Sequence, residues 1–240
     1  MRCNEYIDPM LGGWLSRGLA LAPSRCGVCG AWPDEPVCGE CTDRFAAPRS
    51  RCLRCALPVP GGVEVCGACI IEPPPLDACH AAVDYAYPWS ELVTRYKFGG
   101  EPGLASALAK LAQRPDLADA VARADLLLPM PLSRERLAER GFNQALQLAR
   151  TLAAPKVRAD WLLRLRHTAP QTALGRPQRE ANVRGAFALD PLRAPQVRGK
   201  AVLLVDDVMT SGASLHAAAR AVRGGGAVRV SALVIARTPP

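Results

Sequence analysis

The chain has 240 residues and a formal net charge of +8, with 49% hydrophobic and 22% charged residues. This composition supports a hydrophobic core and excludes a largely disordered protein. The excess of basic residues favours anionic partners, either phosphorylated small molecules or nucleic acid, and does not distinguish between the two. The length exceeds that of a typical single domain, so we expect one α/β domain and a small additional module.

We expect residues 1–22 to form an N-terminal arm or helix. The segment 1–9 contains Glu5 and Asp8 and has no basic n-region, which argues against a secretory signal. No apolar run approaches membrane-spanning length, so a cytoplasmic protein without a transmembrane segment is expected. The segment 10–21 alternates apolar with small and polar residues and predicts a short amphipathic helix. We expect this helix to dock on its own protein, and peripheral contact with a membrane surface is the alternative.

Eight of the ten cysteines form four C-x-x-C pairs. The pairs are Cys26 with Cys29, Cys38 with Cys41, Cys52 with Cys55, and Cys66 with Cys69. Two such pairs supply four thiolates for a tetrahedral zinc site, and four thiolates leave no open position for catalysis. The segment 23–72 therefore predicts a double zinc ribbon with two structural zinc ions, whose folding depends on the metal.

Consecutive pairing leaves eight and ten residues between the C-x-x-C pairs that share a zinc ion, which suits ribbon hairpins. An interleaved pairing stays open. Disulfides would need an oxidising compartment, which the absent export signal argues against. Cys3, Cys79 and His80 have no partner at metal-binding spacing, and we interpret them as ordinary residues. The three prolines at 73–75 predict a stiff linker over residues 73–80.

Residues 81–240 are expected to form an α/β domain whose strands are buried between helices. The expected strands cover 82–87, 125–132, 161–165, 201–205 and 228–236, and the expected helices cover 88–97, 104–112, 144–152 and 215–222. Lys97 lies next to two glycines in a turn over 96–100 and is a candidate for binding an anion, although a solvated lysine is at least as well supported.

The strand over 125–132 is followed by Arg134, Arg136 and Arg140. In an open α/β sheet, ligands lie outside the carboxyl ends of the strands, so these arginines, Arg134 and Arg140 foremost, are candidates for binding an anionic group. A solvated helix face is an equally weighted alternative. Asn143 is expected to cap the helix that follows.

The apolar run 201–205 ends at Asp206 and Asp207, and a loop of small and hydroxyl-bearing residues follows. The loop residues are Thr210, Ser211, Gly212, Ala213 and Ser214. Loop amides and the positive end of the next helix would bind a phosphate, while the two carboxylates would accept hydrogen bonds from sugar hydroxyls. A phosphorylated ribose fits both demands. The alternative is that the acids hydrate a strand end and that Thr210 or Ser211 is an ordinary helix cap.

The whole run 202–214 resembles the phosphoribosyl pyrophosphate (PRPP) motif of type I phosphoribosyltransferases. Two further segments, Pro-Met-Pro-Leu-Ser at 129–133 and Arg-Gly-Phe-Asn-Gln-Ala at 140–145, resemble the signature of the ComF family of ComFC- and GntX-like proteins. The segments 167–171 and 179–187 are similar to the middle of that family, and an N-terminal zinc ribbon belongs to its architecture. The resemblance covers about residues 23–240. It implies a type I phosphoribosyltransferase fold, a mostly parallel sheet flanked by helices, behind the ribbon module.

The same resemblance implies that the site binds PRPP together with Mg²⁺, which would be held mainly by substrate oxygens. Asp206 and Asp207 would hold the ribose hydroxyls and favour a cationic ring, and basic residues would stabilise the departing pyrophosphate. The polar loop over 166–184 suits a mobile hood, whose Arg166, Arg176 or Arg179 would reach the pyrophosphate. A passive basic loop is the alternative reading of that segment.

Two functions follow from these expectations. The first is a phosphoribosyltransferase, or a regulator that responds to PRPP, acting in DNA uptake, competence or nucleotide-related metabolism. The second is a non-catalytic competence protein that binds single-stranded DNA through basic loops and exposed aromatic residues and uses PRPP only as a ligand. Trp14 and Trp32 are candidates for stacking bases, although burial is the favoured expectation for each. No residue pattern identifies the acceptor of a transfer reaction.

Overall fold

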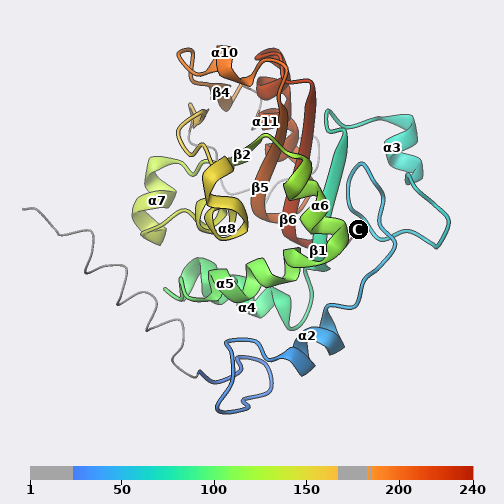
Figure 1. Cartoon of the computed structure of the whole chain (residues 1–240), viewed down its shortest axis with the longest axis vertical. Helices are drawn as coiled ribbons and strands as arrows, with labels where there is room; N and C mark the ends of the chain where they lie inside the picture. Colours follow the sequence, from blue (N-terminus) through green and yellow to red (C-terminus); the bar gives the residue numbers. More distant parts are fainter. Residues whose placement is uncertain (1–23, 167–182, 184, 240) are drawn as a thin grey trace, which may run out of the picture.

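The computed structural model describes residues 24–166, 183 and 185–239, and the expected N-terminal helix over 10–21 lies outside them. A four-stranded parallel sheet forms the centre of the molecule, with helices on both faces (Figure 1). Across the sheet the strands are β1 (Ala78–Asp84), β6 (Arg229–Arg237), β5 (Ala201–Met209) and β2 (Leu126–Pro129). The parallel α/β fold expected from the sequence is therefore confirmed.

The strands of this sheet are buried on both faces. Successive side chains of a strand point to opposite faces, so Leu203 and Val205 enter one core while Val202 and Leu204 enter the other. Aliphatic and β-branched residues suit such doubly covered strands. The apolar run that marked β5 in the sequence thus belongs to the central part of the fold.

Helices from the middle of the chain cover the face of Leu203 and Val205, whereas the other face carries a long helix and a small antiparallel hairpin. The first group contains α4 (Trp89–Phe98), α5 (Leu104–Lys110), η1 (Leu111–Gln113), α6 (Pro115–Arg123) and α8 (Gln144–Ala153). The second contains α11 (Ala213–Gly224), the hairpin strands β3 (Leu162–Arg164) and β4 (Phe187–Leu189), and α10 (Ala194–Val197). The segments α7 (Arg134–Arg140) and η2 (Ala154–Lys156) flank α8. In the described part of the chain, no helix combines the length and the apolar character that crossing a membrane requires.

Some boundaries differ from the prediction for physical reasons. The strand β5 does not end at residue 205 but continues through both acids to Met209, because β6 extends alongside it and pairs with Asp206, Val208 and Met209. The strand β1 begins at Ala78, inside the segment expected to be a linker. The sequence analysis did not predict α6 or β4.

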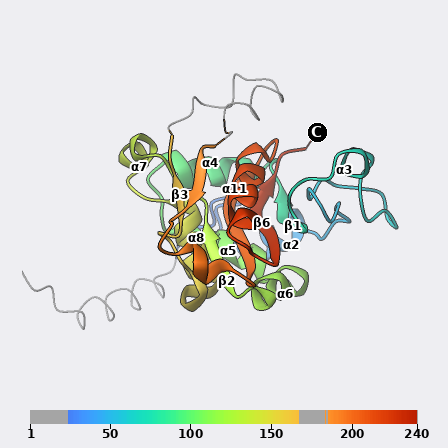
Figure 2. The same cartoon turned by 90° about the horizontal axis from the view of Figure 1, so that it is seen from above.

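The cysteine-rich segments pack against the α/β domain and carry the short helices α2 (Gly39–Phe45) and α3 (Gly67–Ile71) (Figure 2). In the first segment, Cys26 and Cys38 belong to the same core as α4, and the carbonyl of Phe45 accepts a hydrogen bond from Trp89 Nε1 at 2.8 Å. In the second segment, the carbonyl of Leu53 accepts a hydrogen bond from the Cys79 amide in β1 at 2.8 Å. Both segments are therefore anchored to the domain by apolar packing or backbone hydrogen bonds.

Candidate functional site

The difference in length between β2 and β5 creates the site. The last pair of residues between these strands is Pro129 with Val205, and the Met130 amide still donates to the Val205 carbonyl at 2.9 Å. Pro129 and Pro131 then prevent β2 from continuing as a ladder, since proline has no N–H to donate. The end of β5 that carries Asp206 and Asp207 therefore borders a cavity of about 550 Å³ at the carboxyl edge of the sheet.

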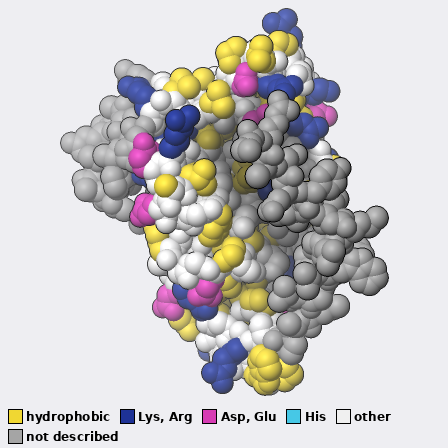
Figure 3. Space-filling view, turned by 90° about the vertical axis from the view of Figure 1, so that its left-hand side faces the viewer, with side chains coloured by type: hydrophobic (Ala, Val, Ile, Leu, Met, Phe, Trp, Pro, Cys, Tyr) yellow, Lys and Arg dark blue, Asp and Glu magenta, His cyan; other side chains and the backbone are white. Residues whose placement is uncertain are grey.

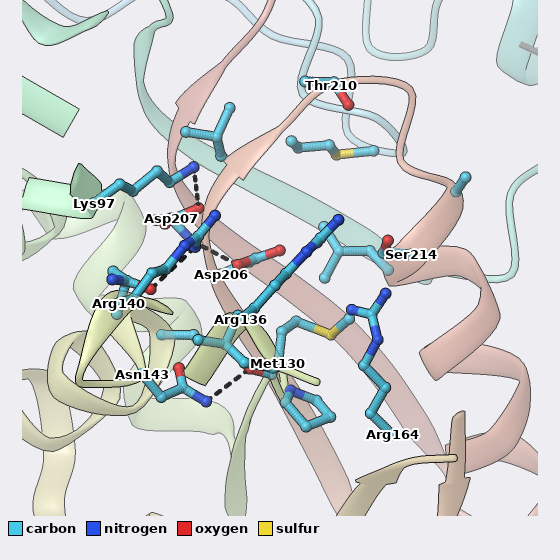
Figure 4. Close-up of a pocket in the computed structure, with 18 of the residues that line it drawn as sticks. Lys97, Met130, Arg136, Arg140, Asn143, Arg164, Asp206, Asp207, Thr210 and Ser214 are labelled. Atoms are coloured by element: carbon cyan, nitrogen blue, oxygen red, sulfur yellow. Dashed lines mark hydrogen bonds and ion pairs between the residues drawn. The ribbon is translucent and has the colours of Figure 1, made fainter. Parts of the chain in front are cut away.

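The two carboxylates at this edge have different neighbours. Asp207 is 6% exposed and forms an ion pair with Lys97 from the last turn of α4, with Nζ and Oδ1 2.8 Å apart. Asp206 accepts a hydrogen bond from the Asp207 amide at 2.9 Å. Figure 4 shows both carboxylates in the cavity, with Lys97 and Arg140 on one side and Arg164 on the other.

The environment of Asp206 disfavours its charge. The pKa of Asp206 is raised to about 7. Burial is the largest cause and the nearby Asp207 carboxylate adds to it, whereas Lys97, the hydrogen bond from the Asp207 amide and Arg140 lower the pKa. A carboxyl group with such a pKa changes its protonation near neutral pH. Asp206 is therefore only partly ionised near pH 7 in the ligand-free protein.

The loop after β5 has the geometry of an anion site. Gly212 adopts a φ of +82°, a left-handed conformation that favours glycine, and a Cβ atom there would also displace the end of the Met209 side chain. Gly212 is also the N-cap of α11 and has no side chain to cap the helix. An anion can therefore take the position of a capping group at the start of α11. Ser211 Oγ accepts a hydrogen bond from the Ala213 amide at 3.4 Å.

Four cations border the cavity: Lys97, Arg136, Arg140 and Arg164. Arg136 and Arg140 come from α7, where the Ser133 side chain caps the helix, and Arg164 comes from β3. Burial and the proximity of another arginine lower the pKa of Arg136 and of Arg164, although guanidinium groups stay charged. In Figure 4 the side chains of Arg136 and Arg164 extend toward Ser214 at the start of α11. This arrangement would bind a second anionic group close to the loop.

Asn143 fixes the helix that closes the cavity. Its Oδ1 caps α8 by accepting from the Leu146 amide at 3.1 Å, and its Nδ2 donates to the Met130 carbonyl at 3.1 Å. The N-cap expected from the sequence is thus confirmed, and it also ties α8 to the end of β2. Next to it, Arg140 donates to Gln144 Oε1 at 3.1 Å and lies over the ring of Phe98 at 5.0 Å.

The structure brings most of the predicted site residues together. Lys97, Arg140, Asp206, Asp207, Thr210, Gly212, Ala213 and Ser214 all line the cavity. Among the described residues, Arg134 and Arg166 are exposed and do not line it, and Ser211 lines a neighbouring cavity instead. Arg176 and Arg179, and most of the expected hood, lie outside the described residues.

Sequence reasoning missed Arg164 and placed Arg134 ahead of Arg136. Arg164 lies in a segment that was interpreted only as a scaffold strand, and a charge inside the apolar run 161–165 was the available signal. On α7, the sequence around Arg134 and Arg136 does not show which of them lines the cavity, because that depends on how the helix is oriented. The aromatic side chains of Tyr85 and Phe98 also line the cavity and carried no comparable signal.

The two cysteine groups have the geometry of metal sites. The four Sγ atoms of Cys26, Cys29, Cys38 and Cys41 lie within 4.8 Å of one another, as do those of Cys52, Cys55, Cys66 and Cys69, so the consecutive pairing is confirmed. The Sγ atoms of Cys29 and Cys38 are 3.7 Å apart, as are those of Cys55 and Cys66. A tetrahedron with Zn–S distances of about 2.3 Å has edges of about 3.8 Å, so both groups fit zinc.

Asp206→Asn is expected to stabilise the ligand-free protein near pH 8 by roughly 1–2 kcal/mol, or roughly 2–8 °C in Tm. The pKa of Asp206 is raised from 3.8 to about 7, so between these values the folded protein holds a proton that the unfolded chain releases. The stability of the wild type relative to the variant therefore falls as the pH rises through this window. Thermal unfolding near pH 4 and near pH 8 measures the difference, which should be small at the lower pH. A variant that is equally stable or less stable than the wild type at both pH values would contradict the assignment.

A family model described as phosphoribosyl transferase domain matches residues 137–239. The chain is 30% identical over 234 residues to the DNA utilization protein YhgH of Shigella flexneri, covering 92% of this chain and all of that protein. It is 28% identical over 194 residues to competence protein F of Haemophilus influenzae, covering 78% of this chain and 84% of that protein. It is also 28% identical over 218 residues to competence protein ComFC of Bacillus subtilis, covering 86% of each chain.

The match to YhgH covers 92% of this chain, so it extends beyond the α/β domain into the cysteine-rich segments. The matched phosphoribosyl transferase segment contains Asp206, Asp207 and the loop before α11. The expected membership of the ComF family and the expected phosphoribosyl transferase domain are thereby confirmed. The chain belongs to the ComF family, together with YhgH and ComFC, and joins a phosphoribosyl transferase domain to two zinc-type groups of four cysteines each.

Proposed function

We propose that this protein binds PRPP with Mg²⁺ in the cavity at the end of β5 and transfers its phosphoribosyl group to an acceptor. The setting would be DNA uptake, competence or nucleotide-related metabolism, in agreement with the names of the relatives. The cytoplasmic location expected from the sequence stays part of this proposal. One observation carries it: two carboxylates and a helix start whose N-cap residue has no side chain lie on the same cavity, next to four cations.

In this proposal the loop over 210–214 binds the 5-phosphate of PRPP through its amides and the positive end of α11. Asp206 and Asp207 accept hydrogen bonds from the ribose hydroxyls. The Lys97 ion pair holds Asp207 in place before the ligand arrives. Positive charge that develops at the anomeric carbon would then lie next to carboxylates whose position is already set.

The pyrophosphate group would meet Arg136, Arg140 and Arg164. Guanidinium groups donate to phosphate oxygens in pairs, and the partial burial of Arg136 and Arg164 strengthens such contacts. The bond from the anomeric carbon to pyrophosphate would break as the bond to the acceptor forms. Arg166, Arg176 and Arg179 stay candidates for a hood that excludes water.

Magnesium would be held mainly by the ligand. Within the described residues, groups of three or more metal-ligating side chains occur only in the two cysteine sets, whereas the cavity offers two adjacent aspartates. Mg²⁺ commonly takes one or two carboxylates plus phosphate oxygens and waters, so the site is compatible with Mg²⁺ that arrives with PRPP. When bound, the ion would neutralise charge on the pyrophosphate.

Pyrophosphate release tests the proposed reaction. Wild-type protein is incubated with PRPP, Mg²⁺ and one candidate acceptor at a time, drawn from nucleobases, nucleosides and single-stranded oligonucleotides. We expect release above the acceptor-free rate with at least one class. Arg134→Gln is the control variant, because it changes an exposed arginine on α7 that does not line the cavity. It should release pyrophosphate at the wild-type rate. PRPP binding without turnover for any acceptor would overturn the transfer reaction.

The second candidate function is a single-stranded DNA-binding protein that uses PRPP only as a ligand. Trp32 in the first cysteine-rich segment is 62% exposed and Phe98 at the cavity is 63% exposed, which offers two aromatic surfaces for stacking bases. On the face of the molecule drawn in Figure 3, the basic side chains of the described residues are interspersed with acidic and hydrophobic ones, which favours a local contact over a broad basic surface. Salt-sensitive binding of a labelled oligonucleotide without turnover would favour this function.

A further inference from the structure

The carboxyl end of β6 carries an arginine that contacts two functional parts of the molecule. Arg237 is 6% exposed, and its Nε donates to the carbonyl of Cys55 at 2.9 Å. Its Nη1 donates to the carbonyl of Met209 at 3.0 Å and to the carbonyl of Thr210. One guanidinium group thus joins a residue of the second cysteine group to the start of the loop after β5.

The sheet places Arg237 between these partners. Arg237 pairs with Met209 in the parallel register of β5 and β6, and the Thr238 amide donates to the Met209 carbonyl at 3.0 Å. The guanidinium also donates to the Thr238 carbonyl at 2.8 Å. Because its planar fork has several donors in fixed directions, it can hold the Cys55 carbonyl and the loop carbonyls at the same time.

The second cysteine group is itself attached firmly to the domain. Arg51, next to Cys52, forms an ion pair with Asp84 at the end of β1, with Nη1 and Oδ1 2.8 Å apart. Arg54 donates to the Leu76 carbonyl at 2.8 Å. A displacement of this cysteine group would therefore also move residues at the carboxyl edge of the sheet, where the proposed phosphate loop begins.

Arg237 borders a cavity. This cavity of about 410 Å³ lies between the second cysteine group and the loop, with Cys66 and Cys69 on one side and Thr210 and Ser211 on the other. Where side chains do not fill the space between two segments, a buried hydrogen-bonded side chain has a large share in fixing their relative position. Arg237 is such a side chain, because it is buried and forms hydrogen bonds to both the cysteine group and the loop.

We propose that Arg237 is a positioning residue through which metal binding at Cys52, Cys55, Cys66 and Cys69 orders the loop over 209–212. A filled second cysteine group fixes the Cys55 carbonyl, the Cys55 carbonyl fixes the guanidinium, and the guanidinium fixes the carbonyls of Met209 and Thr210. The consequence for ligand affinity rests on the proposed function of the loop, whereas the ordering of the loop does not.

Hydrogen–deuterium exchange on ligand-free protein tests the ordering. Arg237→Lys keeps the charge but loses the planar fork, and Cys66→Ser removes one ligand from the second group. We expect each variant to raise amide exchange at 209–213 by about tenfold or more relative to the wild type. The matched control is Cys29→Ser in the first cysteine group, which should leave exchange at 209–213 at the wild-type rate. The core strand β2 serves as the internal reference for intact folding.

The outcomes separate this inference from the proposed function. Unchanged exchange at 209–213 in Arg237→Lys or in Cys66→Ser, or an equal increase in Cys29→Ser, would overturn the positioning role. If the wild type binds PRPP, Arg237→Lys should weaken that binding by about tenfold, in line with the loss of charge-assisted order in the loop. A wild type that binds no PRPP contradicts the proposed function, and the exchange result still decides the role of Arg237.

Discussion

Replacing Asp206 and Asp207 together by asparagine is expected to weaken the binding of PRPP by roughly two to four orders of magnitude, because charge-assisted hydrogen bonds contribute about 1.5–3 kcal/mol each. The change removes the negative charge of Asp207 and the partial charge of Asp206 from the cavity, and it frees Lys97 from its ion pair with Asp207. Both effects would favour an anionic ligand. Weaker binding would therefore report lost contacts to the ribose hydroxyls. Calorimetric titration with PRPP and Mg²⁺ measures the change.

A matched double variant controls for the change in charge. Asp116 and Asp119 on α6 are 62% and 50% exposed at their side chains and pair with Arg114 and Arg123 on the surface. Such pairs contribute little to stability. Replacing both by asparagine should leave PRPP affinity within about twofold of the wild type. If the wild type and the Asp206, Asp207 double variant bound PRPP with equal affinity, the two carboxylates would have no part in binding it.

Chelation of zinc is expected to unfold the cysteine-rich segments, since structural zinc contributes roughly 10–16 kcal/mol of apparent binding free energy in small domains. The native protein should contain two zinc ions per chain, one for each cysteine group. After treatment with a strong chelator, amide exchange over 24–72 should approach that of an unfolded chain. The domain should also lose stability, because Trp89 and Cys79 form hydrogen bonds to these segments.

Restoring zinc controls for chemical damage by the chelator. Exchange over 24–72 and the Tm should return to their starting values when zinc is added in excess. Alkylation under native conditions followed by mass spectrometry adds a second check. Cysteines that bind zinc should become reactive toward the alkylating agent once the metal is removed, whereas disulfide-bonded cysteines would stay unreactive. The account of this module would be wrong if the protein lacked zinc and its exchange pattern did not respond to the chelator.

The parts of the site that the sequence predicted are those encoded by local chemistry. Gly212 is favoured by its positive φ and by the limited room for a Cβ atom, and the side chain of Asn143 caps the helix it precedes. Each feature depends on a few neighbouring residues. The cysteine pairs are similar, because the spacing within each C-x-x-C pair and the short connections between pairs favour consecutive pairing.

The parts that sequence missed depend on contacts between distant segments. The strand β5 runs to Met209 because β6 pairs with it, and the cavity exists because β2 stops at Pro129. Arg164 of β3 lines the cavity. The charge inside the apolar run 161–165 marks this residue, but the contact with the cavity depends on residues far away in the sequence. The same applies to Arg237, whose importance lies in the carbonyls that it joins.

A calorimetric titration of the wild-type protein with PRPP, with and without Mg²⁺, tests the central claim most directly. The account predicts saturable binding of one PRPP per chain in the presence of Mg²⁺, with a Kd below about 1 mM. Binding should be much weaker when Mg²⁺ is omitted, because the pyrophosphate charge is then only partly neutralised. No saturable binding at millimolar PRPP with Mg²⁺ present would contradict the assignment of this cavity.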